Sequence, residues 1–566
     1  MTSLLDIGGL QPFHEAGVLD IPDVQVAAGL MRIGGDSGNL AAALGAALCV
    51  RALRAGSVCV DISADPTIWL PEEPVELPWP ADWAAALARH PLVGEGAGAP
   101  ADTPLRLVGN LLYLQRYWQD EQVVRQALAD RGRLIPVDVE ALHSALEDLF
   151  PQRDRQRLAA ATTALRPLTI IAGGPGTGKT TTVAGLLALL QRIAPGCSVA
   201  LAAPTGKAAA RLQAATGTSA ATLHRLLGWR PDARGRFRHD RSNPLPHDVV
   251  VVDETSMVSL PLMARLLEAV RPDARLVLVG DPDQLASIDA GAVLGDLVAA
   301  EGVAQPDLAA ALDAGTAGAR AAATGVVVLD HNYRFSGAIA DLAAAIRRDE
   351  PDRAVEILRA GHPEVEFLDA PDATVRDDVT EQARRIVAAA AVADAATALT
   401  ELETHRILCA HREGAFGVSH WDGLIAEWTE HLITRRGDQW YVGRPLLVTA
   451  NDYTADLYNG DTGVVVEVAG ELRAAFHRGS GIAVLPLTQV ANVTTLRAMT
   501  IHRGQGSQFD AVTVVLPPAE SPLLTRELLY TAVTRARSRI RVIGSEQAVR
   551  AGIERQVRRA SGLRGG

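Results

Sequence analysis

The chain contains only two lysines, Lys179 and Lys207, although lysine and arginine together number 54. Each lies in a motif, and that of Lys207 is the run Ala203–Leu212. Lys179 belongs to the run Gly173–Thr180, with the sequence GGPGTGKT, in which glycines let successive backbone N–H groups converge on phosphate oxygens. A lysine ammonium reaches a phosphate as a compact charge, whereas the planar guanidinium of arginine favours bidentate partners. We therefore predict that arginine cannot replace these two lysines and that Lys179 marks a nucleotide site.

The residues of this phosphate loop predict which parts of a nucleotide they bind. Lys179 is expected to reach the β- and γ-phosphate oxygens, and the hydroxyl of Thr180 is expected to bind Mg²⁺. The other residues expected to bind the nucleotide are Gly174, Gly176, Thr177, Gly178 and Thr181. Because an apolar strand precedes the loop and a helix follows it, nucleotide binding is favoured over a chance glycine turn.

An acidic pair follows a second apolar stretch, Val249–Val252. Asp253 is expected to hold Mg²⁺ directly or through water, and Glu254 to orient and deprotonate the attacking water. An acidic pair at a strand end can also simply cap a helix. Downstream of a phosphate loop, however, this pair predicts ATP hydrolysis supported by Mg²⁺.

Apolar strands alternate with helices from residue 151 onward: Leu168–Ala172, Val199–Ala203, Asp248–Val252 and Leu276–Val279. Such strands are typical of an α/β fold whose parallel sheet is covered on both faces. The chemistry is then expected at the carboxyl ends of the strands. A second unit of this kind is expected to begin with Val326–Leu329.

The predicted domain organisation has three parts. Residues 1–150 carry no nucleotide motif and are expected to form a mainly α-helical domain that contacts partners. Residues 151–325 and 326–566 are expected to be two tandem parallel-sheet units. The first carries a short insertion at about 228–247, which is either a hairpin pin against a duplex fork or an ordinary solvated loop. The second carries a β-barrel-like insertion at about 436–496, where short strands alternate with turns.

Composition excludes several classes of protein. The net charge of −12 argues against a protein that coats nucleic acid over its whole surface, but it allows a local basic channel. The sequence has neither a run of roughly 18 apolar residues nor the basic start of a signal peptide, so no membrane association and a cytoplasmic location are expected. Four widely spaced cysteines do not have the spacing of a zinc or iron–sulfur site.

The motifs between about Arg153 and Ser545 resemble those of superfamily 1 DNA helicases, and specifically the RecD family, the alpha subunits of exodeoxyribonuclease V (RecBCD). Beyond the phosphate loop and the acidic pair, the matching segments are Gln156, Ala203–Leu212, Ala221–Leu227, Gly280–Leu285, Asn332–Phe335, Met499–Phe509 and Tyr530–Arg537. The resemblance implies two tandem RecA-like motor domains powered by ATP, with a small SH3-like β insertion in the second.

The resemblance also implies roles for single residues. Gln156 is expected to read adenine, Gln284 to couple the γ-phosphate to DNA, and the Gly506 amide to face phosphate. Arg334 and Arg535 are expected to act as arginine fingers, each worth on the order of 10³-fold in rate, with surface salt bridging as the alternative. The residues expected to face DNA are Pro204, Thr205, His224, Thr500 and His502.

Other positions are less typical of the family. Arg503, Gly504 and Gln508 stand where lysine, serine and glutamate are usual, which leaves a nucleotide role for the Gln508 side chain open. Aromatic side chains that could stack on DNA bases are Phe335, Phe416 and Trp421, and burial in the core is the alternative for each.

The function implied by the resemblance is ATP-dependent 5'-to-3' translocation and DNA unwinding. The chain would act as the RecD subunit beside RecB and RecC on single-stranded and double-stranded DNA ends, in double-strand break repair and homologous recombination. One alternative is a stand-alone helicase of the same superfamily 1B branch, although such relatives carry a longer N-terminal extension. A structural subunit with a decayed ATPase is the other alternative, and the intact Lys179, Asp253 and Glu254 argue against it. DNA cleavage is expected in a partner, because the common nuclease centre needs a lysine and both lysines belong to helicase motifs.

Overall fold

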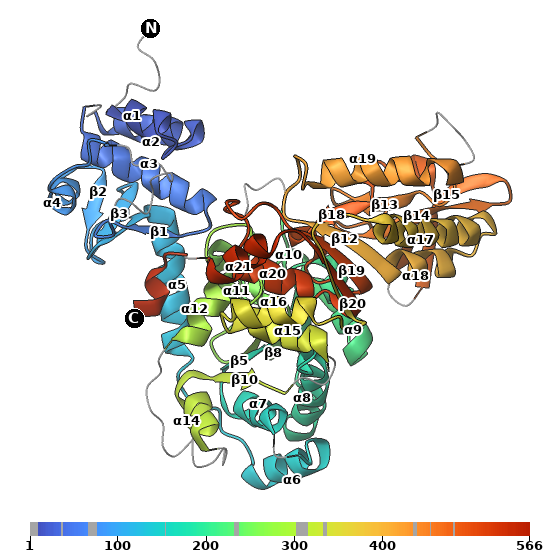
Figure 1. Cartoon of the computed structure of the whole chain (residues 1–566). Coiled ribbons are helices and arrows are strands. Elements are labelled where there is room, and N and C mark those ends of the chain that lie inside the picture. Colours follow the sequence, from blue (N-terminus) through green and yellow to red (C-terminus); the bar gives the residue numbers. More distant parts are fainter. Residues whose placement is uncertain are drawn as a thin grey trace.

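The computed structural model describes most of the chain: residues 9–35, 38–65, 76–152, 154–230, 237–300, 315–331, 337–433, 439–452, 454–478, 481–557 and 559–565. An N-terminal domain, two parallel-sheet units and an inserted antiparallel sheet follow one another along the chain (Figure 1). This architecture confirms the predicted α/β fold with two tandem motor domains.

The N-terminal domain is mainly helical, as expected, and also contains a small sheet with the strand order β1-β4-β3-β2. Its elements are α1(Gln11–Glu15), α2(Ile21–Gly34), α3(Leu40–Arg54), β1(Cys59–Asp61), α4(Trp83–Ala88), β2(Val93–Glu95), β3(Leu105–Val108), β4(Leu111–Leu114) and α5(Gln115–Asp130). The central helix α3 is rich in alanine, and a Cβ added to Gly45 would lie 2.9 Å from Leu112 and 3.1 Å from Leu87. A small residue is therefore needed where α3 packs on the sheet.

The first motor is built on a six-stranded parallel sheet with the order β10-β5-β9-β8-β6-β7. Its strands are β5(Leu168–Gly173), β6(Val199–Ala203), β7(Ala220–Thr222), β8(Val249–Val252), β9(Arg275–Gly280) and β10(Val326–Leu329). Its helices are α6(Val139–Leu149), α7(Arg155–Leu165), α8(Lys179–Ile193), α9(Gly206–Thr216), α10(Leu223–Leu226), α11(Leu260–Ala269), α12(Val293–Ala299) and α14(Gly315–Thr324). The side chains of β8 are buried along its whole length, as the apolar pattern predicted.

The strand Val326–Leu329, predicted to open the second motor, belongs to the first motor. Strand β10 pairs with β5 at the edge of the first sheet, with Val326 opposite Ile170 and Leu329 opposite Gly173. The expectation that Val326–Leu329 opens the second unit is therefore wrong. An apolar strand carries no information about which sheet it joins, and here α14 packs beside α7 and returns the chain to the first sheet.

The second motor has a five-stranded parallel sheet with the order β11-β20-β19-β12-β18. Its strands are β11(Val365–Leu368), β12(His405–Cys409), β18(Ala498–Thr500), β19(Phe509–Val515) and β20(Ala536–Ile543). Its helices are α15(Ala338–Arg347), α16(Pro351–Arg359), α17(Ala373–Ala391), α18(Ala395–Thr404), α19(Val418–Thr429), α20(Arg526–Val533) and α21(Glu546–Glu554).

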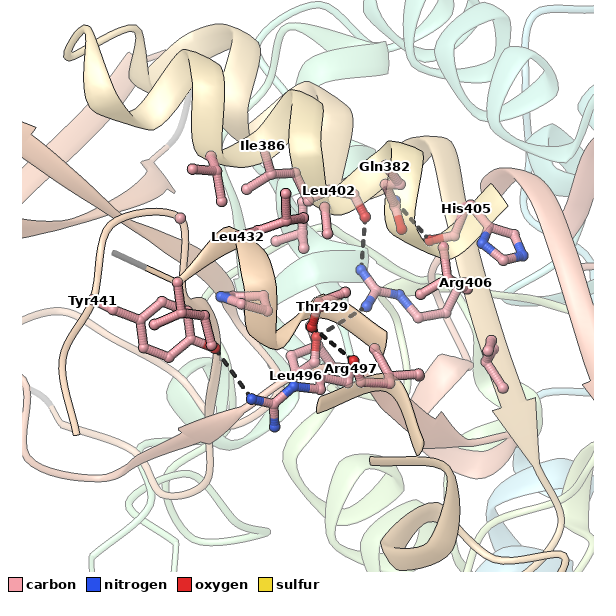
Figure 2. A pocket seen from close by; sticks show the side chains of 18 residues that line it. Gln382, Ile386, Leu402, His405, Arg406, Thr429, Leu432, Tyr441, Leu496 and Arg497 are labelled. Carbon is pink, nitrogen blue, oxygen red and sulfur yellow. Dashed lines mark hydrogen bonds between the residues drawn. The ribbon is translucent and has the colours of Figure 1, made fainter. Parts of the chain in front are cut away.

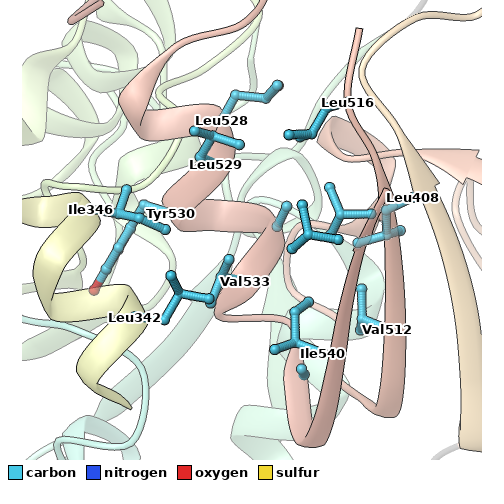
Figure 3. Packing of buried hydrophobic residues seen from close by; sticks show 14 of the residues in the cluster. Leu342, Ile346, Leu408, Val512, Leu516, Leu528, Leu529, Tyr530, Val533 and Ile540 are labelled. Carbon is cyan, nitrogen blue, oxygen red and sulfur yellow. The ribbon is translucent and has the colours of Figure 1, made fainter. Parts of the chain in front are cut away.

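The core of the second motor lies where α15 and α20 cover the sheet. Figure 3 shows Leu342 on α15 and Val533 on α20 facing Val512 and Ile540 of the sheet. All four side chains are buried, and burial of each contributes roughly 1.5–3 kcal/mol to folding. This packing holds α20, which ends next to Arg535, in a fixed place on the second sheet.

The insertion is an antiparallel sheet with the order β16-β15-β14-β13-β17. Its strands are β13(Pro445–Val448), β14(Thr462–Val468), β15(Glu471–Arg478), β16(Gly481–Pro486) and β17(Val493–Thr495). It lies between α19 and β18 in the sequence, which agrees with the small β insertion expected there. In the first motor, the insertion predicted at 228–247 contains an antiparallel bridge between Trp229 and Phe237, and its residues 231–236 lie outside the described residues.

The C-terminal segment runs back to the N-terminal domain. Val58 donates its backbone N–H to the carbonyl of Ala560 at 2.9 Å, and Gly562 donates its N–H to Glu121 Oε2 at 3.0 Å. In Figure 1 the C-terminus accordingly lies beside α5 and α12. The C-terminal segment is thus tied to the N-terminal domain and to the first motor.

Candidate nucleotide-binding site and DNA interface

A cavity of about 490 Å³ lies at the carboxyl ends of the first sheet, where the two motors face each other. The predicted site residues that line it are Gly176, Gly178, Lys179, Thr180, Thr181, Asp253, Glu254, Gln284 and Arg535. Arg211 and Gln508 also line it. Segments separated by more than 300 residues are therefore brought to one cavity. Four residues predicted to bind the nucleotide do not line this cavity: Gln156, Gly174, Thr177 and Gly506.

The phosphate loop has the geometry that its glycines predict. Gly176 and Gly178 have φ values of 84° and 81°, which L-residues with a Cβ rarely adopt, and α8 begins directly at Lys179. Lys179 Nζ donates to the carbonyl oxygens of Gly173 at 2.6 Å and Gly174 at 2.9 Å. The ammonium group is therefore held over the loop, where exchange of these carbonyls for phosphate oxygens needs little movement.

The acidic pair lies at the end of β8 and is buried. Glu254 has a left-handed backbone with φ of 52°, and its N–H donates to Asp253 Oδ1 at 2.8 Å. Burial and the neighbouring Glu254 charge raise the pKa of Asp253. Burial also acts to raise the pKa of Glu254, but Arg211, Arg535 and Lys179 outweigh it and lower that pKa. Glu254 is thus kept ionised, as a base must be.

Arg211 was not among the predicted site residues. It lies on α9, and its Nη2 donates to Glu254 Oε1 at 2.6 Å while its Nη1 donates to the carbonyl of Gly506 at 3.4 Å. One side chain therefore connects the base on the first motor with the second motor. Its place in the matching segment Ala203–Leu212 was the available signal, but the pairing itself depends on the fold.

We expect Arg211→Gln to lower kcat roughly tenfold or more with little change in KM, because Glu254 loses the partner that orients it. Arg211→Lys keeps the charge and should restore part of the rate. Steady-state ATPase assays measure both effects, with Arg192→Gln as the control because Arg192 pairs with Asp148 on the surface. A raised KM at unchanged kcat would contradict this positioning role.

Arg535 lies at the end of α20 and is fully buried. Its Nε donates to the carbonyl of Thr531 at 3.1 Å, and its Nη1 donates to the carbonyl of Ser507 at 3.2 Å. Burial lowers its pKa, and Glu254 acts in the opposite direction. The predicted finger therefore faces the cavity from the second motor. Arg334, with the rest of Asn332–Phe335, lies outside the described residues.

The loop after β9 connects the two motors. Gln284 Nε2 donates to Asp281 Oδ2 at 2.9 Å, so this predicted coupling residue is held within its own loop. The next residue, Leu285, accepts a hydrogen bond from Gln505 Nε2 at 2.7 Å on its carbonyl and donates its N–H to Thr531 Oγ1 at 2.8 Å. This loop is thus hydrogen-bonded to the second motor through Gln505 and Thr531, two residues that the sequence did not single out.

Tyr530 is a further cleft residue that the sequence did not single out. A Cβ added to Gly174 would lie 2.8 Å from the Tyr530 hydroxyl, so a larger residue there would require the Tyr530 side chain to shift. Burial, Asp281 and Asp283 raise the Tyr530 pKa well above its ordinary value. The phenol therefore stays protonated between the phosphate loop and the loop after β9.

The predicted DNA-facing residues follow the carboxyl ends of parallel strands. Pro204 and Thr205 follow β6, where Thr205 Oγ1 caps α9 by accepting from the N–H of Ala208 at 3.2 Å. His224 lies in α10, directly after β7. Thr500 ends β18 and is buried, whereas His502 in the next turn is partly exposed. The first three residues thus lie at the carboxyl ends of strands in the first sheet, and the last two at the carboxyl end of a strand in the second. Their contact with DNA remains a prediction.

The aromatic candidates differ in their surroundings. Trp421 is only 2% exposed and packs on the inner face of α19 with Ile407 and Cys409, so the stacking role is wrong and the core alternative holds. Phe416 is 42% exposed in the loop after β12 and remains a candidate. Phe335 lies outside the described residues. Apolar residue type alone does not distinguish these cases, because burial depends on which helix face meets the sheet.

Three family models match parts of the chain: an AAA domain over residues 156–290, a UvrD-like helicase C-terminal domain over 495–543, and the N-terminal domain of RecBCD enzyme subunit RecD over 15–113. Among solved structures, Pif1 helicase from Bacteroides in complex with ADP-AlF3 and ssDNA is similar at 16% identity and a TM-score of 0.37, over 67% of this chain and 89% of that one. No helix within the described residues is long and apolar enough to span a membrane.

Curated relatives extend over nearly the whole chain. RecBCD enzyme subunit RecD of Mycolicibacterium smegmatis is 49% identical over 98% of this chain and 98% of its own length. That of Mycobacterium tuberculosis is 47% identical over 98% and 96%. The ATP-dependent RecD2 DNA helicase of Deinococcus radiodurans is 32% identical over 69% of this chain but only 48% of its own length. Similarity of this extent shows that the chain belongs to the RecD family of RecBCD enzyme subunits.

Proposed function

We propose that this chain hydrolyses ATP to move 5'-to-3' along single-stranded DNA as the RecD motor of a RecBCD helicase-nuclease. The enzyme class, an ATP-dependent DNA helicase, follows from its family. The observation that supports hydrolysis by this chain is the cavity that brings Lys179, Glu254 and Arg535 together from two motors. A decayed ATPase would not need to retain all of these groups.

Residues of the first motor bind and orient the nucleotide. Lys179 exchanges the loop carbonyls for β- and γ-phosphate oxygens, and the glycine amides bind the same phosphates. Thr180 and Asp253 offer oxygen ligands in the same cavity, a set that suits Mg²⁺ bound jointly by protein and phosphates. Bound Mg²⁺ neutralises negative charge on the phosphate oxygens.

The adenine ring of the nucleotide is expected to bind in a second cavity beside the phosphate loop. A second cavity of about 240 Å³ is lined by Gly174, Asp330, Tyr530 and α15. Asp330 pairs with Arg155 at 3.5 Å, next to the predicted adenine-reading Gln156. We place the adenine on this side of the loop.

Hydrolysis is completed by residues from both sides of the cleft. Glu254 takes a proton from the attacking water, and Arg211 holds the carboxylate in place. Arg535 stabilises charge that develops on the γ-phosphate, and it does so best when the motors are closed. Because Leu285 is hydrogen-bonded to the second motor, closure and reopening are transmitted to the DNA-facing edge.

Co-purification with RecB and RecC tests whether the chain assembles with these subunits. Oligonucleotides that carry biotin at one end test the direction of movement along single-stranded DNA. Movement 5'-to-3' should displace streptavidin from a biotin at the 3' end in an ATP-dependent manner and leave a 5'-biotin complex in place. Displacement only from the 5' end would overturn the proposed direction. Activity of the isolated chain equal to that of the complex in every assay would favour the stand-alone helicase.

We propose that the N-terminal domain docks onto the partner subunits. Ile33 is 81% exposed on α2, and Val26 lies two turns earlier on the same face and is also exposed. The double variant Val26→Asp and Ile33→Asp should lose co-purification with RecB and RecC while keeping DNA-stimulated ATPase. Val392→Asp, at an exposed apolar position of the second motor, is the control. Normal assembly of the double variant would place the partner surface elsewhere.

A further inference from the structure

The C-terminal segment links the second motor to the first motor and to the N-terminal domain. It follows α21 of the second motor, where the N–H of Val557 donates to Glu527 Oε2 on α20 at 3.1 Å. Further along, the N–H of Ala560 donates to Ser57 Oγ of the N-terminal domain at 3.1 Å. The final turn η7(Gly562–Gly565) then packs against α12 of the first motor. One short segment therefore contacts three parts of the molecule.

Arg559 lies at the point where these three parts meet. Its Nη1 donates to the carbonyl of Gly291 in the first motor at 3.3 Å. The N–H of Gly291 in turn donates to the carbonyl of Gly56 in the N-terminal domain at 2.9 Å. Gly56 has a φ of 84°, and a Cβ added to it would lie 2.6 Å from Arg559 Cζ. Gly291 is thus held through its N–H by the N-terminal domain and through its carbonyl by the C-terminal segment.

Gly291 belongs to the loop between β9 and α12, which also carries the predicted coupling residue Gln284. Within this loop, Ser287 Oγ donates to the carbonyl of Gly291 at 3.1 Å. Gln284 lines the nucleotide cavity, and its neighbour Leu285 is hydrogen-bonded to the second motor. Fixing Gly291 therefore restricts where this loop can place Gln284.

A cavity of about 90 Å³ lies between this loop and the C-terminal segment. Gln284 and Leu285 line it from the loop, and Val557 and Arg559 line it from the C-terminal segment. Close-packed side chains would hold the loop by themselves, whereas a cavity with room for about three waters leaves it space to shift. The hydrogen bond from Arg559 to Gly291 restrains the loop on this side.

The charge of Arg559 is balanced by both motors. Burial lowers its pKa, while Glu527 of the second motor and Asp296 of the first motor act in the opposite direction. A buried cation is costly unless opposite charges and hydrogen bonds compensate it. Arg559 is therefore held best when the carboxylates of both motors are near it.

Other buried or partly buried arginines of the second motor are bonded within it. Figure 2 shows a cavity of about 60 Å³ that Arg406 and Arg497 line. Arg406 Nη2 donates to the carbonyl of Leu402 at 2.6 Å, and Arg497 Nη2 donates to the Tyr441 hydroxyl at 3.2 Å. These bonds stay within the second motor and its insertion, whereas the bond from Arg559 reaches the first motor.

We propose that Arg559 is a positioning residue for ATP hydrolysis, which fixes Gly291, and through it the loop that carries Gln284, relative to the N-terminal domain and the second motor. This inference rests on the proposed function, because it concerns how the nucleotide cavity is regulated. A displacement of the N-terminal domain shifts Gly56 and so moves Gly291. The N-terminal domain thereby affects hydrolysis without contacting the nucleotide.

ATPase assays with saturating oligo-dT test this positioning role. Arg559→Gln should lower kcat roughly fivefold with little change in the KM for ATP, the factor expected when one hydrogen bond is lost. Arg559→Lys can still donate to the Gly291 carbonyl and should restore much of the rate. Arg550→Gln is the matched control, because Arg550 on α21 pairs with Glu546 at 2.9 Å within the second motor.

Two further variants separate positioning from a general loss of stability. Ser57→Ala removes the acceptor of the Ala560 N–H and should lower kcat by a smaller factor. Arg559→Gln combined with Gln284→Ala should have the kcat of Gln284→Ala alone, because both changes act through the same loop. A change that only weakens the fold would instead multiply the two effects.

Hydrogen exchange measures the contact without any need for ATP turnover. Arg559→Gln should speed the exchange of the amides of residues 281–291 and leave the exchange of β8 unchanged. Multiplied effects on kcat in the double variant, or unchanged exchange of the loop, would overturn the inference. If instead the wild-type protein hydrolyses no ATP with DNA, the proposed function fails, and the exchange of the loop still decides whether Arg559 holds it.

Discussion

Replacing Lys179 with glutamine should abolish DNA-stimulated ATP hydrolysis, with a fall in kcat of roughly 100-fold or more. The ammonium already lies over the phosphate loop, 2.6 Å from the Gly173 carbonyl and 2.9 Å from that of Gly174. Glutamine can replace neither its charge nor its reach to the β- and γ-phosphates. A coupled ATPase assay with saturating oligo-dT measures the loss, and circular dichroism shows whether the fold is intact.

Lys179→Arg is the sharper test, because it keeps the charge and changes only the shape. A planar guanidinium favours bidentate partners and cannot act as a compact charge on the phosphate oxygens, so we expect a severe loss here as well. Arg192→Lys, a surface exchange of the same two residue types on the same helix α8, is the control. A fully active Lys179→Arg variant would refute the argument that lysine persists because arginine fails.

Arg535→Ala should lower kcat on the order of 10³-fold while changing nucleotide affinity much less. The guanidinium enters the cavity from the second motor and is held by the carbonyls of Ser507 and Thr531. Its charge therefore matters most in the closed transition state. Pre-steady-state hydrolysis and equilibrium binding of a fluorescent nucleotide separate the two effects.

The matched control is Arg537→Ala, because Arg537 belongs to the same motif but is exposed and pairs with Asp510 at 3.2 Å. Removing the buried Arg535 takes away the hydrogen bond to the Ser507 carbonyl, whereas the Thr531 carbonyl still accepts from Thr534 Oγ1 at 3.1 Å. Arg535→Lys is therefore needed to separate folding from catalysis. A raised KM with unchanged kcat would exclude the finger role. Arg334→Ala tests the second predicted finger in the same assays.

Local motifs could be predicted from the sequence because their chemistry depends on neighbours in the chain. The phosphate loop needs glycines at Gly176 and Gly178 for its left-handed turns, and the structure has these turns there. Asp253 and Glu254 follow a strand whose apolar run already requires burial on both faces. The two lysines were likewise apparent from composition alone.

The sequence by itself thus determined the fold class, the phosphate loop and the acidic pair, and only the tertiary structure decided which distant groups meet them. Nothing in the apolar run Val326–Leu329 specifies that it pairs with β5, and nothing in Trp421 specifies that its helix face meets the sheet. The contacts of Arg211 with Glu254 and of Lys207 with Glu403 also join segments far apart in the chain. The physical reason is that hydrogen bonds and ion pairs depend on distances of a few ångströms, which are set by sheet order and domain packing rather than by spacing along the sequence.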